Sequence, residues 1–326
     1  MMEGAELCVL QLNNSCTRPK LSDSEYLLIY ILLSCISLLT ATLNLLVIIS
    51  ISHFKQLHTP TNLLLLSLAV SDFFVGLIIF FQIVLIDGCS YLSDVMCALC
   101  QYLTYIITSA SVGTMVLISV DRYVAICDPL HYPIKITLKR IQICICLCWM
   151  CSVLCFSLLM KDHLRHPSRY RSCSGDCVIS FNFIERIIDL ILTFIIPSAV
   201  IFVLYMRIFI VAVSQARALQ SHIATVTLQR SEPVTAKKSE MKAARTLGIV
   251  IVAFLICICP YFCVTLTGQD TLLTASSEAF VACLFYFNSC LNPVIYVFFY
   301  PSFRKSIKLT VTLQILQPDS CDTNIM

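Results

Sequence analysis

The sequence predicts an all-α membrane protein: a bundle of seven transmembrane helices followed by a short amphipathic eighth helix. Two observations support this fold class. The 326 residues are 58% hydrophobic and 13% charged, with a mean hydropathy of +0.87, whereas a soluble domain is about 25% charged. The hydrophobic residues also gather in seven runs, and each run is long enough for a bilayer core, which takes about 20 apolar residues.

We number these runs as spans one to seven. In chain order they cover roughly 26–52, 62–86, 97–120, 141–160, 184–213, 246–266 and 276–299. The chain therefore divides into an extracellular tail over 1–25, a transmembrane domain over 26–300, and an amphipathic helix with a short cytoplasmic tail over 301–326. Phe303-Arg304-Lys305 opens this last segment, which has the character of a helix that lies on the inner membrane surface.

The distribution of Lys and Arg predicts the orientation, because cytoplasmic loops carry an excess of both. If the N-terminus is outside, 15 of the 22 basic residues lie inside. The others lie outside: Arg18, Lys20, Lys161, Arg165, Arg169, Arg171 and Arg186. The same orientation exposes Asn13, which begins the glycosylation acceptor Asn13-Asn14-Ser15.

The outer end of span three begins with a cysteine, Cys97, and two more cysteines precede span five in an outside loop. Thiols outside the cell are readily oxidised to disulfides. We expect a Cys97–Cys177 disulfide. Cys173 then remains, and its partner in the N-terminal tail is either Cys16 or Cys8.

The spans carry motifs that resemble rhodopsin-like G-protein-coupled receptors. They are Asn44, LSLAVSD ending in Asp72, Asp121-Arg122-Tyr123 closing the uncharged span three, Trp149, Pro197, Tyr205, Phe254, CICP ending in Pro260, and NPVIY from Asn292 to Tyr296. Within that class the chain resembles the trace amine-associated receptors. The stretches that carry this resemblance are 58–73, 125–132, 242–250 and 288–300, although Ser302 stands where that family has a Trp.

The resemblance implies a plasma-membrane receptor for small amines, with an olfactory role. It also implies a heterotrimeric G protein as partner, stimulatory and raising cAMP, with the basic loop 214–245 at the interface. An alternative is a receptor of the same class for a non-amine ligand, in which Asp189 is structural. The sequence shows no repeat of the kind typical of transporters.

Other function classes find little support in the sequence. It shows no metal-ligand cluster, nucleophile–base set or phosphate loop, so we expect no enzyme activity and no cofactor apart from an allosteric sodium ion. The net charge of +3 is too small to indicate nucleic acid.

An amine ligand is a cation and needs a buried carboxylate. Most aminergic receptors carry this acid on span three, where the present chain has Thr104. Span five offers Asp189 instead, and such a charge should face the bundle because it is costly against lipid. The resemblance to some fish members of the family, which carry the acid on span five instead of span three, favours Asp189 as the ligand counter-ion. The alternative is a local ion pair with Arg186 at i, i+3.

Glu185 lies one turn before Asp189 and is either a second cation site, which would suit a diamine, or a solvated helix end. The remaining walls are expected to be aromatic and polar, since aromatic faces attract ammonium groups. The predicted wall residues are Thr104, Tyr105, Thr108, Tyr261, Phe262 and Tyr286.

Asp72 places a second costly charge in the middle of span two. By resemblance it belongs to a sodium site that collapses on activation; the alternative is a hydrated polar cluster without an ion. The oxygen donors expected at the same depth are Ser111, Asn288, Ser289 and Asn292.

The cytoplasmic ends of spans three and six are expected to form the activation switch. An Arg122–Glu240 ion pair would hold the two spans together in the inactive state, and a kink at Pro260 would let span six swing. The residues assigned to this switch are Asp121, Arg122, Tyr123, Tyr205, Glu240, Phe254, Pro260 and Tyr296.

Overall fold

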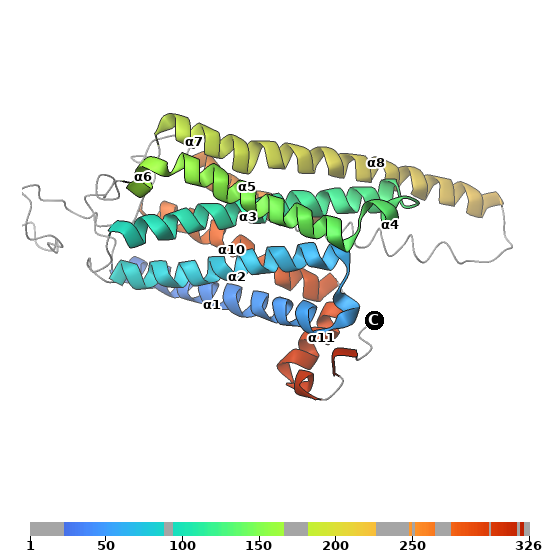
Figure 1. Ribbon diagram of the computed structural model, residues 1–326, viewed down its shortest axis with the longest axis horizontal. Helices are drawn as coiled ribbons and strands as arrows, with labels where there is room; N and C mark the ends of the chain where they lie inside the picture. Colours follow the sequence, from blue (N-terminus) through green and yellow to red (C-terminus); the bar gives the residue numbers. More distant parts are fainter. Residues whose placement is uncertain are drawn as a thin grey trace, which may run out of the picture.

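A computed structural model describes residues 23–87, 94–165, 182–225, 248–249, 252–264, 275–299, 301–317 and 320–322. Every regular element in these ranges is helical. Figure 1 shows long helices running side by side along one direction, with α11 turned away from the bundle below the right-hand ends of α1 and α2. The all-α bundle predicted from the sequence is confirmed.

The long helices lie on the predicted spans. They are α1 (Asp23–His53), α2 (Pro60–Asp87), α3 (Asp94–Cys127), α5 (Leu138–Leu159), α7 (Phe183–Leu190), α8 (Ile196–Thr225) and α10 (Ala275–Phe299). The helix α7 continues through the π-helical turn η3 (Ile191–Ile195) into α8. Five helices of the described chain are long and apolar enough to cross a membrane. Two shorter apolar helical segments lie on spans six and seven: Val252–Val264, and Phe280–Ile295 within α10.

The short elements connect and follow these helices. They are η1 (Lys55–Leu57), α4 (Tyr132–Lys135), α6 (Lys161–Arg165), α11 (Pro301–Val311), η4 (Gln314–Leu316) and η5 (Ser320–Asp322). Along α11 the side chains of Phe303, Ser306 and Thr310 are buried, whereas its basic side chains are exposed.

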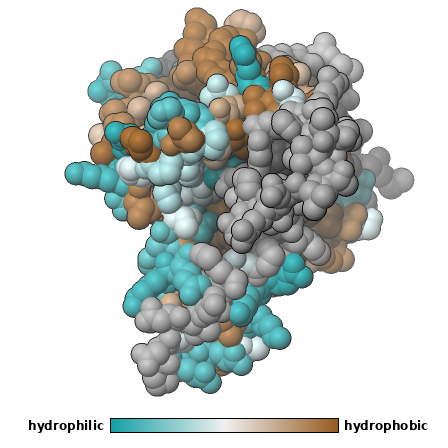
Figure 2. Space-filling model, turned by 90° about the vertical axis from the view of Figure 1, so that its right-hand side faces the viewer, coloured by the Kyte–Doolittle hydropathy of each residue, from teal (hydrophilic) through white to brown (hydrophobic). Residues whose placement is uncertain are grey.

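Apolar side chains fill the interior and also cover the outer flank. Leu68 and Phe254 are buried in the core, yet Leu38, Leu158 and Phe202 are 69%, 75% and 64% exposed. An outer surface of this kind suits lipid tails, which need no polar partner. Figure 2 looks along the bundle from the α4 end: hydrophobic residues cover much of its flank, and the projecting lower part, which is α11 and its continuation in Figure 1, is mostly hydrophilic.

Buried polar bonds tie α3 into the centre of the bundle. Trp149 Nε1 on α5 donates to Ser67 Oγ on α2 at 3.2 Å, and Ser67 in turn lies 3.3 Å from Thr114 Oγ1 on α3. Ser152 Oγ on α5 donates to Ser109 Oγ on α3 at 3.1 Å. Three helices are thereby fixed at one depth, which positions the α3 residues that line the site.

Glycine allows α1 and α2 to approach closely. Ser37 Oγ on α1 donates to the backbone oxygen of Gly76 on α2 at 2.8 Å. A Cβ added to Gly76 would lie 2.8 Å from the backbone nitrogen of Ala41. Small residues at such crossings are how membrane helices gain close packing.

Candidate ligand pocket and signalling sites

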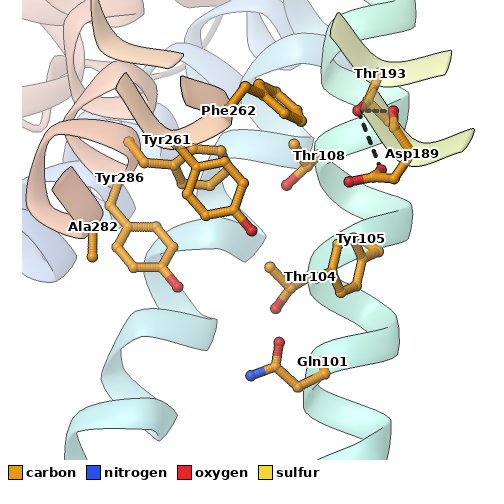
Figure 3. A pocket seen from close by; sticks show the side chains of 11 residues that line it. Gln101, Thr104, Tyr105, Thr108, Asp189, Thr193, Tyr261, Phe262, Ala282 and Tyr286 are labelled. Atoms are coloured by element: carbon orange, nitrogen blue, oxygen red, sulfur yellow. Dashed lines mark hydrogen bonds between the residues drawn. The ribbon is translucent and has the colours of Figure 1, made fainter. Parts of the chain in front are cut away.

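A pocket of about 100 Å³ opens between α3, the α7–η3 segment, the helix over 252–264 and α10. Figure 3 shows the side chains that line it. They are Gln101, Thr104, Tyr105, Thr108, Asp189, Thr193, Tyr261, Phe262, Ala282, Phe285 and Tyr286. This set contains every predicted ligand residue except Glu185.

Glu185 takes part in the start of α7. The backbone N–H of Asn182 donates to Glu185 Oε2 at 2.8 Å, and the two residues form a capping box. This bond satisfies a backbone donor that a helix start leaves without an intrahelical partner. Glu185 is not among the described residues that line the pocket, so the structure gives its carboxylate a local role instead of a place beside the ligand.

Asp189 lies one turn further along α7 and faces the pocket. Its side chain is buried, and the Thr193 hydroxyl lies 2.6 Å from the Asp189 backbone oxygen and 3.2 Å from its carboxylate Oδ1 (Figure 3). Among the described residues no Lys or Arg pairs with this carboxylate, so the alternative ion pair with Arg186 is not formed. Burying a carboxylate without a neighbouring cation costs desolvation free energy, and a cationic ligand would offset that cost.

The helix changes form directly after Asp189. Residues Ile191–Ile195 (η3) make a π-helical turn, and Thr193 lies within it. A π turn widens the helix locally and frequently marks functional sites. Here it contains the hydroxyl that lies beside the Asp189 carboxylate.

Aromatic rings form the opposite wall. Phe262 stacks on Phe194 with ring centroids 4.9 Å apart, and Tyr261 lies 4.8 Å from Phe285. In Figure 3 the Tyr261 hydroxyl points into the pocket. These ring contacts hold the wall residues in place, and the ring faces are suited to attract a cation.

Sequence reasoning missed four of the lining residues: Gln101, Thr193, Ala282 and Phe285. Helical spacing was a usable signal for three of them. Gln101 precedes Thr104 by three residues, Thr193 follows Asp189 by four, and Ala282 precedes Tyr286 by four, so each pair shares a helix face. No comparable spacing distinguished Phe285 from the other apolar residues of span seven.

Asp72 is fully buried in the middle of α2. Asn292 Nδ2 on α10 donates to Asp72 Oδ2 at 2.8 Å, whereas Asp72 Oδ1 has no hydrogen-bond partner in the described part of the chain. Asn44 Oδ1 is likewise without a partner, although its Nδ2 donates to the Ser289 backbone oxygen at 3.0 Å. The predicted oxygen donors Ser111, Asn288 and Ser289 are also buried.

This donor set fits the ion that was predicted for it. Hard cations take carboxylate, carbonyl and hydroxyl oxygens as ligands. Asp72 Oδ1 and Asn44 Oδ1 are both buried and have no hydrogen-bond partner among the described residues, and a bound Na⁺ would satisfy such oxygens.

Near the C-terminal end of α3, Asp121 and Arg122 form a buried ion pair. Thr61 Oγ1 at the start of α2 and the Tyr132 hydroxyl on α4 each donate to the Asp121 carboxylate, both at 2.9 Å. Burial, and then the neighbouring Asp121 carboxylate, raise the pKa of Tyr132 to about 12, so this phenol stays protonated and remains a donor. The sequence did not reveal Thr61 and Tyr132 as partners of this acid.

A second group of charges holds α4 against the end of α3. Asp128 accepts hydrogen bonds from Lys135 Nζ at 2.8 Å and from His131 Nδ1 at 2.7 Å. These two bonds lower the pKa of Asp128 to about 2, so its carboxylate is ionised throughout the physiological range. The Tyr132 donor is therefore presented by a short helix that is itself fixed.

The other predicted switch residues lie in different surroundings. Phe254 is buried in the core, Pro260 lies inside the helix over 252–264, and Tyr123 and Tyr205 are partly buried on α3 and α8. Glu240 falls outside the described residues, so the Arg122–Glu240 pair stays a prediction. The predicted disulfides and the glycosylation site also stay predictions, because the structure does not describe Cys8, Asn13, Cys16, Cys173, Cys177 or the side chain of Cys97. The side chain of Tyr296 lies outside the described part as well.

Comparison with known proteins adds independent information. The family described as 7 transmembrane receptor (rhodopsin family) matches residues 43–296. Trace amine-associated receptor 13c of Danio rerio is 37% identical over 98% of this chain and 96% of its own length. Trace amine-associated receptor 9 of Rattus norvegicus is 38% identical over 98% and 97%, and receptor 7e of Mus musculus is 37% identical over 98% and 92%.

The family match covers most of the chain, and these relatives align over nearly its whole length. Proteins of this family are receptors, not enzymes, and they work in a membrane with a small-molecule ligand and a G protein as partners. The apolar helices agree with a multi-pass protein of the plasma membrane. The chain therefore belongs to the rhodopsin family of seven-transmembrane receptors and, within it, to the trace amine-associated receptors.

Proposed function

We propose that this chain senses small amines at the cell surface and holds their ammonium group at Asp189. The observation that carries the proposal is a buried carboxylate that faces a pocket and has no cationic partner among the described residues. The names of these relatives, all trace amine-associated receptors, support the same class of ligand.

The geometry explains how an amine would be held without an acid on α3. Thr104 lines the pocket from α3, while the carboxylate comes from α7. The ammonium group donates to Asp189, and the Thr193 hydroxyl beside Oδ1 keeps the carboxylate oriented toward the cavity. Tyr261 and Phe262 then supply aromatic surface for the cation and for the carbon chain attached to it.

Binding at this place connects two helices that extend to the cytoplasm. Asp189 lies on the α7–η3–α8 segment, and Tyr261 follows Pro260 on the helix over 252–264. An agonist that binds one arrangement of these helices more tightly shifts the population toward it. In the proposed response span six moves away from Arg122, and a stimulatory G protein is recruited on the cytoplasmic side. The proposed orientation has the N-terminus outside the cell.

The proposal is tested in cells that express this chain together with a cAMP reporter. The cells are exposed in turn to monoamines, to diamines and to alcohols of the same shape, and the cAMP response to each compound is measured. We expect one or more amines to raise cAMP while the neutral alcohols are inactive. If no amine acts although the receptor is confirmed at the cell surface, the alternative of a non-amine ligand with a structural Asp189 takes its place.

We also propose that the buried oxygens around Asp72 bind sodium and stabilise the inactive arrangement. Replacing sodium chloride by potassium chloride should then increase the affinity of wild type for an activating amine, measured by competition binding on membranes. Asp72→Asn keeps the shape but removes the charge that the cation needs, so its amine affinity should be the same in both salts. An equal sodium effect in wild type and Asp72→Asn would contradict the site.

A further inference from the structure

We infer that the preferred ligand is a short amino alcohol, whose hydroxyl is bound at the end of the pocket away from Asp189. The inference rests on the proposed function, since it takes Asp189 as the ammonium site. Figure 3 shows Asp189 and Thr193 on one side of the pocket, with Tyr286 on the opposite side and Gln101 and Thr104 between them along α3.

The end of the pocket near Tyr286 is polar but neutral. The Tyr286 hydroxyl on α10 donates to Gln82 Oε1 on α2 at 2.8 Å, so its hydrogen is already used. Thr104 Oγ1 donates to the Cys100 backbone oxygen at 2.9 Å, so its hydrogen is used as well. Both oxygens keep acceptor capacity, and a ligand hydroxyl is a neutral group that can donate to either.

The charge balance of the pocket argues against a second ammonium group. Asp189 is the one carboxylate among the described lining residues, and Glu185 is engaged in the capping box of α7. A second cation at the Tyr286 end would be buried without a counter-ion, which costs more than burying a hydrogen-bonded hydroxyl. A ligand with a methyl group at this end would form no hydrogen bond with the oxygens of Tyr286 and Thr104.

The size of the pocket limits the length of the ligand. An apolar cavity of about 150 Å³ accommodates benzene. A pocket of about 100 Å³ is smaller, which favours a ligand with fewer non-hydrogen atoms than the six of benzene. An amino alcohol with a chain of about three carbons meets this limit and still carries a polar group at each end.

The inference is tested with three ligands that have the same number of non-hydrogen atoms: 3-aminopropan-1-ol, butan-1-amine and propane-1,3-diamine. Potency is measured in the cAMP assay on the full chain, and the thermal shift of the purified receptor gives a readout that needs no G protein. We expect the amino alcohol to be about tenfold more potent than either of the others, as one additional buried hydrogen bond would allow.

Tyr286→Phe removes the hydroxyl and keeps the ring, so it should reduce the advantage of the amino alcohol over butan-1-amine to less than about threefold. Tyr102→Phe is the matched control. It removes a hydroxyl from α3 that lies 2.6 Å from Ser157 Oγ, and Tyr102 is not among the described lining residues, so the advantage should stay near tenfold.

The outcomes separate this inference from the function on which it rests. If butan-1-amine or the diamine matches the amino alcohol on wild type, or if Tyr286→Phe weakens all three ligands equally, the hydroxyl site is wrong while the amine receptor stands. If none of the three acts while another amine of the screen does, the hydroxyl site is wrong and the amine receptor stands. If no amine of the screen produces a response or a thermal shift, both the hydroxyl site and the amine function are overturned.

Discussion

Asp189→Asn is expected to raise the half-maximal concentration of every activating amine by about 100-fold or more. Asparagine has nearly the same shape and keeps an oxygen for Thr193, which lies 3.2 Å from the carboxylate in wild type. The substitution therefore removes the charge with little change in packing. Losing one partner of a buried charge pair costs about 2–5 kcal/mol, and about 2.7 kcal/mol corresponds to 100-fold. The measurement is a cAMP dose–response curve for each amine found in the screen.

Glu185→Gln is the matched control for this experiment. It removes a carboxylate from the same helix, one turn away, that binds the Asn182 backbone N–H instead of lining the pocket. Its amine potency should stay within about threefold of wild type, since glutamine keeps an oxygen that can accept the Asn182 N–H in a capping box and no ligand contact is lost. Equal potency of wild type and Asp189→Asn, at equal surface expression, would place the cation elsewhere.

Gly76→Ala is expected to lower the melting temperature of the purified receptor by about 2–12 °C. The new Cβ would lie 2.8 Å from the backbone nitrogen of Ala41 and 3.2 Å from its Cα, so α1 and α2 would have to separate. Overpacking of this kind costs about 1–3 kcal/mol, and each kcal/mol lowers the melting temperature by about 2–4 °C. The bond from Ser37 Oγ to the Gly76 oxygen would also lengthen.

Two further glycines provide graded controls for this prediction. At Gly113 the added Cβ would meet the Cys148 thiol at 2.3 Å, which is a side chain that can rotate, so Gly113→Ala should cost less than Gly76→Ala. At Gly248 the nearest atom is a Tyr205 ring carbon at 3.4 Å, so Gly248→Ala should leave the melting temperature unchanged. Equal losses in all three variants would show that helix crossing distance is not the cause.

The fold was predictable because a bilayer restricts what a spanning segment can be. Apolar runs of sufficient length form helices in a membrane, since every backbone group must be satisfied within the segment. The predicted third span thus corresponds to α3, and the predicted fifth span to the α7–η3–α8 segment. The π turn over Ile191–Ile195 was not predictable, because its residues are as apolar and as β-branched as those of the neighbouring turns.

The pocket was predictable where a single residue carried an unusual cost. Asp189 stood out because a charge in a span has to face the bundle, and the structure places it in the pocket. Partnerships between helices were not predictable in the same way. The bonds from Tyr286 to Gln82 and from Tyr132 to Asp121 depend on how helices far apart in the chain lie against each other, and one sequence carries no record of such pairs.

The central claim is that the Asp189 carboxylate binds the ammonium group of the ligand. Its most direct test is isothermal titration calorimetry of the purified receptor with the most potent amine of the screen, because the dissociation constant is then measured without any signalling step. We predict saturable binding to wild type and a dissociation constant for Asp189→Asn that is about 100-fold higher or beyond detection. The same dissociation constant for both proteins would contradict the account.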